Sequence, residues 1–157
     1  MWRSRMKNKI WLLIKCIALP LFVGILSGIL IRNGVREYGA LEKPFLSPPG
    51  FLFPIVWTIL YVLMGIGSYL VLINDGKSPI SIYGWQLIVN FLWPTFFFNF
   101  KWYLFSFFWL LLLWGLVAVM LAQFYRVSKV AAYLNVPYLV WLTFAAYLNL
   151  GVYLLNR

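Results

Sequence analysis

The sequence predicts an all-α integral membrane protein, a bundle of five transmembrane helices with one long loop between the first and the second. The chain has 157 residues, of which 64% are hydrophobic and 10% charged. Soluble domains average about 25% charged residues, so these charges are too few to cover a water-facing surface. The apolar residues also gather into runs of about 20, the length that a helix needs to cross a bilayer. We expect one transmembrane domain over residues 1–157.

Five apolar runs have this length, and we place helices approximately at 10–31, 51–73, 80–100, 102–125 and 130–155. The first run follows a charged N-terminus, as in a secretory signal peptide, but it exceeds the roughly 7–15 apolar residues of such peptides. We therefore expect a retained first helix, with a cleaved signal as the alternative. Only Asn99 and Lys101 separate the third run from the fourth. A fused helix would be far too long for one bilayer, which supports the separation.

The net charge of +10 does not indicate nucleic acid, because the basic residues precede or separate the apolar runs and no nucleic-acid motif is present. Four of them form an N-terminal cluster: Arg3, Arg5, Lys7 and Lys9. By the positive-inside rule, this cluster predicts a cytoplasmic N-terminus. The C-terminus and the 32–50 loop would then lie outside, and we expect the location to be a bacterial cell membrane.

The side chains offer little for conventional catalysis. The sequence has no histidine, a single cysteine, Cys16, and three acidic residues, Glu37, Glu42 and Asp75, all between apolar runs. No Ser-His-Asp, Cys-His or paired-carboxylate arrangement can be built from this set. Neither a metal-ligand cluster nor a glycine-rich phosphate loop is present. The residues therefore indicate a membrane pocket without ordinary catalytic groups and without a metal.

Three of the predicted spans each gather polar and aromatic residues on one helical face. These faces are Phe53, Trp57, Tyr61, Met64 and Ser68 in the second span, Gln86, Asn90, Trp93 and Phe97 in the third, and Tyr138, Trp141, Ala145 and Asn149 in the fifth. A buried amide costs several kcal/mol unless it is hydrogen-bonded, so the faces should point into the bundle. They serve either interhelical hydrogen bonds, worth about 0.6–2 kcal/mol, or an aromatic pocket for a large planar ligand.

Prolines recur inside or near the starts of the spans, at Pro20, Pro54, Pro94 and Pro137. Each one removes a backbone donor and frees a carbonyl one turn back, which lipid does not tolerate unless protein or cavity water satisfies it. Two interpretations remain open, bent helices that wall a cavity and merely irregular packing.

Three segments carry a family resemblance: ALEKPFLSPPGFLFPIVWTILYVLMGIGSYLV at 40–71, QLIVNFLWPTFFF at 86–98 and PYLVWLTFAAYLN at 137–149. Together they resemble the hallmark of the TspO/MBR family, the tryptophan-rich sensory proteins and mitochondrial translocator proteins (peripheral benzodiazepine receptors). The order and spacing of the segments and the number and length of the spans are also similar to those of this family.

The resemblance implies a five-helix membrane bundle, often dimeric, that binds porphyrins such as protoporphyrin IX and related tetrapyrroles. We therefore expect a membrane receptor or sensor for these planar lipophilic ligands, with no intrinsic cofactor. Its implied partners are membrane lipids, a porphyrin as ligand or substrate, and a second copy in a homodimer. The alternatives are a light- and oxygen-dependent porphyrin-degrading enzyme, a facilitator of tetrapyrrole or lipid transport, and a purely structural scaffold.

Carried over position by position, Trp57 and Trp141 match the paired pocket tryptophans of the family, and they would be catalytic only if photo-oxidative activity is present. The full set of expected ligand-binding residues is Trp57, Tyr61, Asn90, Trp93, Trp141, Ala145 and Asn149. The expected rigid lid comprises Lys43, Pro44, Pro48, Pro49 and Gly50. Prolines at these positions stiffen the loop before the second span.

Three positions depart from the family pattern. Glu37 and Leu46 stand where many relatives carry loop tryptophans, which weakens any claim that the lid stacks on the ligand. Trp109 stands where an acidic residue is frequent in the fourth span. The indole of Trp109 cannot supply a carboxylate at this position.

Overall fold

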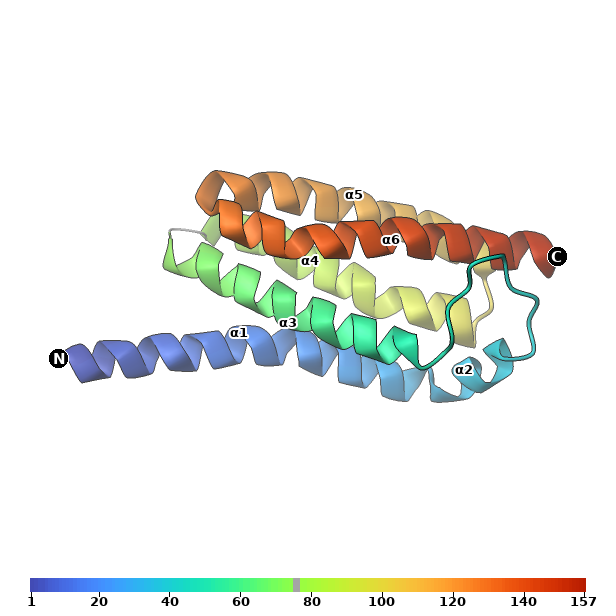
Figure 1. Cartoon of the computed structure of the whole chain (residues 1–157), viewed down its shortest axis with the longest axis horizontal. Helices are drawn as coiled ribbons and strands as arrows, with labels where there is room; N and C mark the ends of the chain where they lie inside the picture. Colours follow the sequence, from blue (N-terminus) through green and yellow to red (C-terminus); the bar gives the residue numbers. More distant parts are fainter. Residues whose placement is uncertain (75–76) are drawn as a thin grey trace.

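The computed structural model describes residues 1–74 and 77–157, and this part of the chain is helical and without strands (Figure 1). The all-α prediction is confirmed. The elements are α1 (Trp2–Leu30), α2 (Arg32–Tyr38), α3 (Leu52–Ile73), α4 (Lys77–Pro94), the π-helical turn η1 (Thr95–Asn99), α5 (Tyr103–Val127) and α6 (Lys129–Leu155).

Four of the described helices, α1, α3, α5 and α6, are long and apolar enough to cross a membrane. The predicted span 80–100 corresponds to α4 and η1, and α4 is not among the four. Length and hydropathy therefore do not establish the predicted count of five transmembrane helices. The physical reason lies partly in Gln86 and Asn90, which lower the hydropathy of α4 but are 0% and 2% exposed. These polar groups face protein.

The helix bounds differ from those predicted near the N-terminus and in the long loop. Helix α1 begins at Trp2, so the basic cluster continues the helix beyond the rest of the bundle (Figure 1). The predicted loop 32–50 contains α2, which leaves 39–51 as the irregular part. That part holds the left-handed residue Leu46, whose φ is 72°.

The five long helices contact one another in a ring. Helix α1 packs against α3 and α4, α6 packs against α3 and α5, and α4 packs against α5. Glycines allow α1 and α3 to approach closely, since a Cβ on Gly65 would lie 2.5 Å from Ile17 Cα and one on Gly24 would clash with the ring of Tyr61. Gly24 and Gly65 therefore serve packing within the chain.

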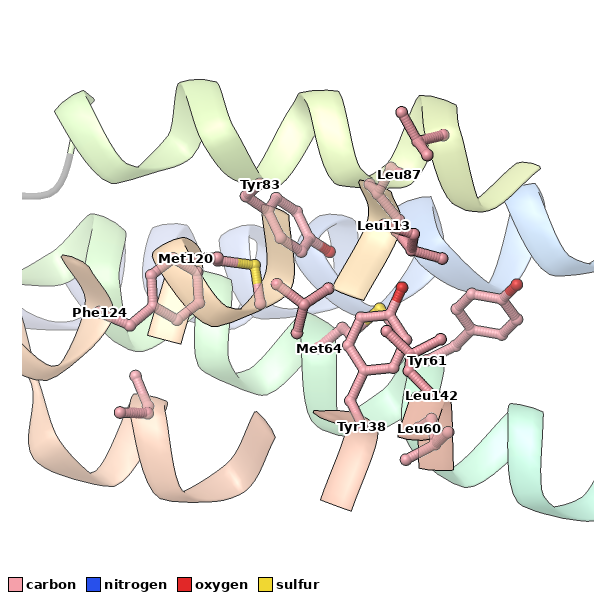
Figure 2. Packing of buried hydrophobic residues seen from close by; sticks show 14 of the residues in the cluster. Leu60, Tyr61, Met64, Tyr83, Leu87, Leu113, Met120, Phe124, Tyr138 and Leu142 are labelled. Carbon is pink, nitrogen blue, oxygen red and sulfur yellow. The ribbon is translucent and has the colours of Figure 1, made fainter. Parts of the chain in front are cut away.

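The core lies between these helices (Figure 2). Its most buried apolar side chains come from α3, α5 and α6, and those that are fully buried include Met64, Leu110, Met120, Phe124 and Leu142. Several tyrosines lie in the same cluster, among them Tyr61, Tyr83 and Tyr138. The core thus carries hydroxyl groups that need partners.

Pro94 explains where α4 ends. It has no N–H, so it cannot continue the regular helical hydrogen bonding. The backbone then forms the wider π-helical turn η1. After this turn, the Phe100 N–H donates to Thr95 O at 3.1 Å, and the Trp102 N–H donates to Phe96 O at 3.0 Å. Lys101 then adopts a φ of 56°, and α5 begins two residues later. The break between α4 and α5 thus follows a proline and a left-handed residue.

Candidate functional site

A chain of four buried polar side chains joins α3, α4 and α6. The Tyr61 hydroxyl donates to Asn90 Oδ1 at 2.8 Å, and Asn90 Nδ2 donates to the Tyr138 hydroxyl at 2.7 Å. The Tyr138 hydroxyl in turn donates to Gln86 Oε1 at 2.8 Å. All four residues are at most 7% exposed. The three predicted faces therefore meet inside the bundle, and they bring Tyr61 and Asn90 together.

This polar chain satisfies groups that would otherwise be costly in an apolar interior. The Asn90 side chain is engaged at both its oxygen and its nitrogen, and Gln86 Nε2 lies 3.9 Å from Met64 Sδ. A buried polar group left without a partner costs about 1–3 kcal/mol. For Gln86 and Asn90, interhelical hydrogen bonding accounts for the contacts that the structure shows.

Trp57 packs on both tyrosines of the polar chain. Its ring centroid lies 5.6 Å from that of Tyr61 and 6.1 Å from that of Tyr138, the second contact being edge-to-face. The indole is half-buried against the core. Rings at these separations are in the usual range for aromatic pairs. Trp57 therefore forms an aromatic surface that packs on the hydrogen-bonded rings of Tyr61 and Tyr138.

Trp141 lies on α6, three residues after Tyr138. Its ring meets Phe53 edge-on at 5.8 Å and lies 5.6 Å from Phe144. The indole nitrogen Nε1 is buried, and it has no hydrogen-bond partner in the part of the chain that the structure describes. Ala145, one turn further along α6, is 6% exposed and adds a small side chain to this face.

Trp93 and Asn149 belong to a second polar cluster, nearer the α2 end of the bundle. Asn149 Oδ1 accepts from Trp93 Nε1 at 3.0 Å and from the Ser106 hydroxyl at 3.1 Å. Asn149 Nδ2 donates to Tyr103 O at 2.7 Å. Trp93 also stacks on Phe97, with centroids 5.5 Å apart. The expected site residues thus fall into two groups, one around Trp57 and one around Asn149.

The predicted lid is fastened to the end of α6. The Glu42 N–H donates to Asn156 Oδ1 at 3.1 Å, and Asn156 Nδ2 donates back to Glu42 O at 2.8 Å. The Tyr147 hydroxyl donates to Phe45 O at 2.6 Å. These bonds join residues more than 100 positions apart in the sequence.

The expected lid residues have different surroundings. Pro44 packs on Gly151, where a Cβ would lie 2.5 Å from its ring, and Lys43 Nζ lies 5.0 Å from the centroid of the Tyr38 ring. Pro49 and Gly50 accept hydrogen bonds from the start of α3, from Leu52 N–H and Phe53 N–H respectively. Pro48 lies in the same irregular stretch before α3.

A cavity of about 280 Å³ lies beside α2 rather than between Trp57 and Trp141. Its lining is Gly34, Glu37, Tyr38, Ala40, Leu41, Phe97, Phe98, Lys101 and Tyr103. Glu37 and Lys101 form an ion pair there. The hydrogen bond from Lys101 to Glu37, together with the charge of Glu37, raises the pKa of the lysine. Burial raises the pKa of the Tyr38 hydroxyl, and the nearby Tyr103 adds to this effect.

Several residues of these clusters were outside the predicted site. Tyr138 and Gln86 share the predicted faces by spacing, so that signal was available in the sequence. No local pattern distinguishes Ser106 or Asn156, which find their partners only through the packing of distant helices. Trp109, the departure from the family pattern, donates from Nε1 to Val89 O at 2.8 Å and so joins α5 to α4.

Comparison with known proteins agrees with the motifs. A family model described as the TspO/MBR family matches residues 16–155. The tryptophan-rich protein TspO of Chlorobaculum tepidum is 36% identical over 96% of this chain and 99% of its own length. The human translocator protein is 38% identical over 87% of this chain and 83% of its own. The tryptophan-rich sensory protein of Cereibacter sphaeroides is 35% identical over 76% of each chain. The chain is therefore a membrane protein of the TspO/MBR family.

Proposed function

We propose that this protein is a membrane receptor or sensor that binds protoporphyrin IX and related planar lipophilic ligands. The ligand site would be the aromatic face that Trp57 and Trp141 form between α3 and α6. Relatives named as tryptophan-rich sensory and translocator proteins support a role in sensing or handling a ligand within the membrane.

The observation that carries this proposal is the indole N–H of Trp141, which is buried beside aromatic rings and has no hydrogen-bond partner among the described residues. A buried tryptophan N–H usually finds a partner, and leaving it without one costs about 1–3 kcal/mol. A porphyrin offers a broad π surface to the rings and carboxylate or nitrogen acceptors to an N–H donor. Because Phe53 packs edge-on against Trp141, we expect a planar ligand to enter by displacing such rings.

The proposal includes five membrane crossings, with α4 and η1 together as the third. In this arrangement the buried amides of α4 face the bundle and leave apolar residues such as Trp85 and Ile88 toward lipid. The N-terminus would be cytoplasmic in a bacterial cell membrane, where the basic start of α1 meets anionic lipid. A homodimer is proposed on the resemblance alone.

A titration of the purified protein with protoporphyrin IX, followed by porphyrin fluorescence in the dark, tests the site. Trp57→Phe and Trp141→Phe remove the proposed contacts, and we expect the double variant to bind about tenfold or more weakly, a loss of about 1.4 kcal/mol. Trp85→Phe is the matched control, because Trp85 is 61% exposed and lies away from this face. Wild-type affinity in the double variant would eliminate the proposed site.

A second candidate function, light- and oxygen-dependent breakdown of bound porphyrin, is favoured by the contacts of Trp57 with two tyrosines. Oxidisable rings would then surround a photoexcited ligand, which itself supplies the reactivity. Trp57 and Trp141 would be the catalytic residues. Illuminating the same samples should give a defined product faster than detergent and an unrelated tryptophan-containing protein do. Equal bleaching of the porphyrin in all samples would exclude catalysis and leave porphyrin binding as the function.

A further inference from the structure

A second cavity, of about 360 Å³, lies where the start of α5 meets the end of α6. Its lining is Lys101, Trp102, Tyr103, Leu104, Phe105, Tyr153, Asn156 and Arg157. It is distinct from the Trp57 and Trp141 face, with which it shares no residue. Two cations, four aromatic rings and one amide therefore converge at this end of the bundle.

The cavity lies at the start of α5, where we expect the level of the lipid headgroups. Helix α5 has 25 residues and is about 38 Å long at 1.5 Å per residue, whereas the hydrocarbon core of a bilayer is about 30 Å thick. Trp102, Tyr103 and Tyr153 are residue types that gather at the membrane–water interface. Further into the helix, Leu104 and Phe105 are 40% and 46% exposed. The cations of the cavity, Lys101 and Arg157, thus lie beside an exposed apolar surface.

The charge of this cavity is only partly neutralised within the chain. Lys101 forms an ion pair with Glu37 on its α2 side, and its side chain remains 53% exposed. A lysine ammonium has three donors, so it can bind a second anion. Within the described residues, Arg157 has no ion pair. The pair with Glu37 also keeps Lys101 protonated, since it raises the pKa of the lysine.

We propose that this cavity binds the phosphate headgroup of an anionic phospholipid between Lys101 and Arg157, with an acyl chain against Leu104 and Phe105. Basic pockets between membrane helices are suited to such headgroups. Inorganic phosphate shares the anionic chemistry but has no apolar part to cover the exposed leucine and phenylalanine. The site is independent of porphyrin binding. Glu37 competes with the phosphate for Lys101, so removal of its charge should strengthen lipid binding.

Native mass spectrometry of the full chain in mild detergent, titrated with phosphatidylglycerol or with phosphatidylcholine of the same acyl chains, tests this site. Wild type should retain phosphatidylglycerol in preference to phosphatidylcholine. Lys101→Gln and Arg157→Gln should each weaken phosphatidylglycerol binding about fivefold, and Glu37→Gln should strengthen it. Arg126→Gln is the matched control, because it removes one exposed cation from the opposite end of α5.

The outcomes separate the alternatives. Equal loss in the Arg126 variant would show that net charge alone attracts the lipid, and equal retention of both lipids would show that the headgroup is not recognised. Displacement of the lipid by millimolar inorganic phosphate would assign the site to a free anion. Each of these results would overturn the proposal. Phosphatidylglycerol affinity should rise in Glu37→Gln and fall in Lys101→Gln. These opposite changes cannot arise from misfolding alone. Unchanged protoporphyrin affinity in these variants is also expected, so this test does not depend on the proposed function.

Discussion

Tyr138 and Asn156 both lie at the α6 side of the bundle, and each makes two hydrogen bonds to residues distant in sequence, but their surroundings differ. Tyr138 is 1% exposed and joins Asn90 and Gln86 of α4 in the interior. Asn156 binds the backbone of Glu42 at the end of the bundle, where these bonds meet solvent. Figure 2 shows Tyr138 within the packed core cluster.

This difference in burial indicates which hydrogen bonds contribute most to the stability of the bundle. When an interior hydrogen bond is broken, its former partners remain buried, and each unsatisfied group destabilises the folded state by about 1–3 kcal/mol. When a bond at the solvent-exposed end is broken, water replaces the lost partner. We therefore expect the polar chain between α3, α4 and α6 to hold a rigid frame, and the 39–51 segment to open locally while that frame stays folded.

The largest effect is expected for Tyr138→Phe. The substitution keeps the ring but removes the hydroxyl, so Asn90 Nδ2 and Gln86 Oε1 both lose their partner. We expect a loss of about 2–6 kcal/mol in the free energy of unfolding, from two unsatisfied buried groups, measured by denaturant unfolding in detergent. Tyr133→Phe is the control, since Tyr133 is 62% exposed. Equal stability of the two variants would mean that the buried hydroxyl of Tyr138 does not stabilise the interior of the bundle.

A smaller effect is expected for Asn156→Ala, which removes both bonds to Glu42. Because these groups are exposed, we expect a change below about 1 kcal/mol in global stability. Hydrogen exchange should nevertheless accelerate in the 39–51 segment, since the Glu42 N–H loses its acceptor. Arg157→Gln leaves those two bonds intact and is the neighbouring control. Unchanged exchange at Glu42 would contradict the view that this contact fastens the lid.

The smallest effect concerns the exposed ion pair between Glu37 and Lys101. Its hydrogen bond raises the pKa of Lys101 in the folded chain, so the stabilisation is complete below the unfolded lysine pKa of about 10.4. It is lost as the pH rises through the higher folded value. The difference in melting temperature between wild type and Glu37→Gln should therefore shrink at alkaline pH. A difference that stays constant from about pH 8 to above the lysine pKa would refute this.

The inward-facing sides of the helices could be predicted because helices in an apolar solvent must turn their polar groups inward. The spacing of Tyr61, Asn90 and Tyr138 placed each on an inward face, and the structure joins all three. Helix α2 was missed because its seven residues, RNGVREY, lack the apolar periodicity of the long helices. The start of α1 was placed too late because a hydropathy pattern detects the apolar run and not the charged helical turns before it.

Composition and hydropathy were sufficient for the all-helical membrane class, because so few charges leave lipid as the only compatible solvent, and the motifs were sufficient for the family. The partners of individual groups required the packed helices. Three features depend on how distant segments meet: the Trp141 N–H that has no partner within the described residues, the two hydrogen bonds of Tyr138, and the attachment of the lid to Asn156. Periodicity specifies the face on which a side chain lies, whereas hydrogen bonds need atoms within about 3.5 Å, and that separation is set by the packing of the whole bundle.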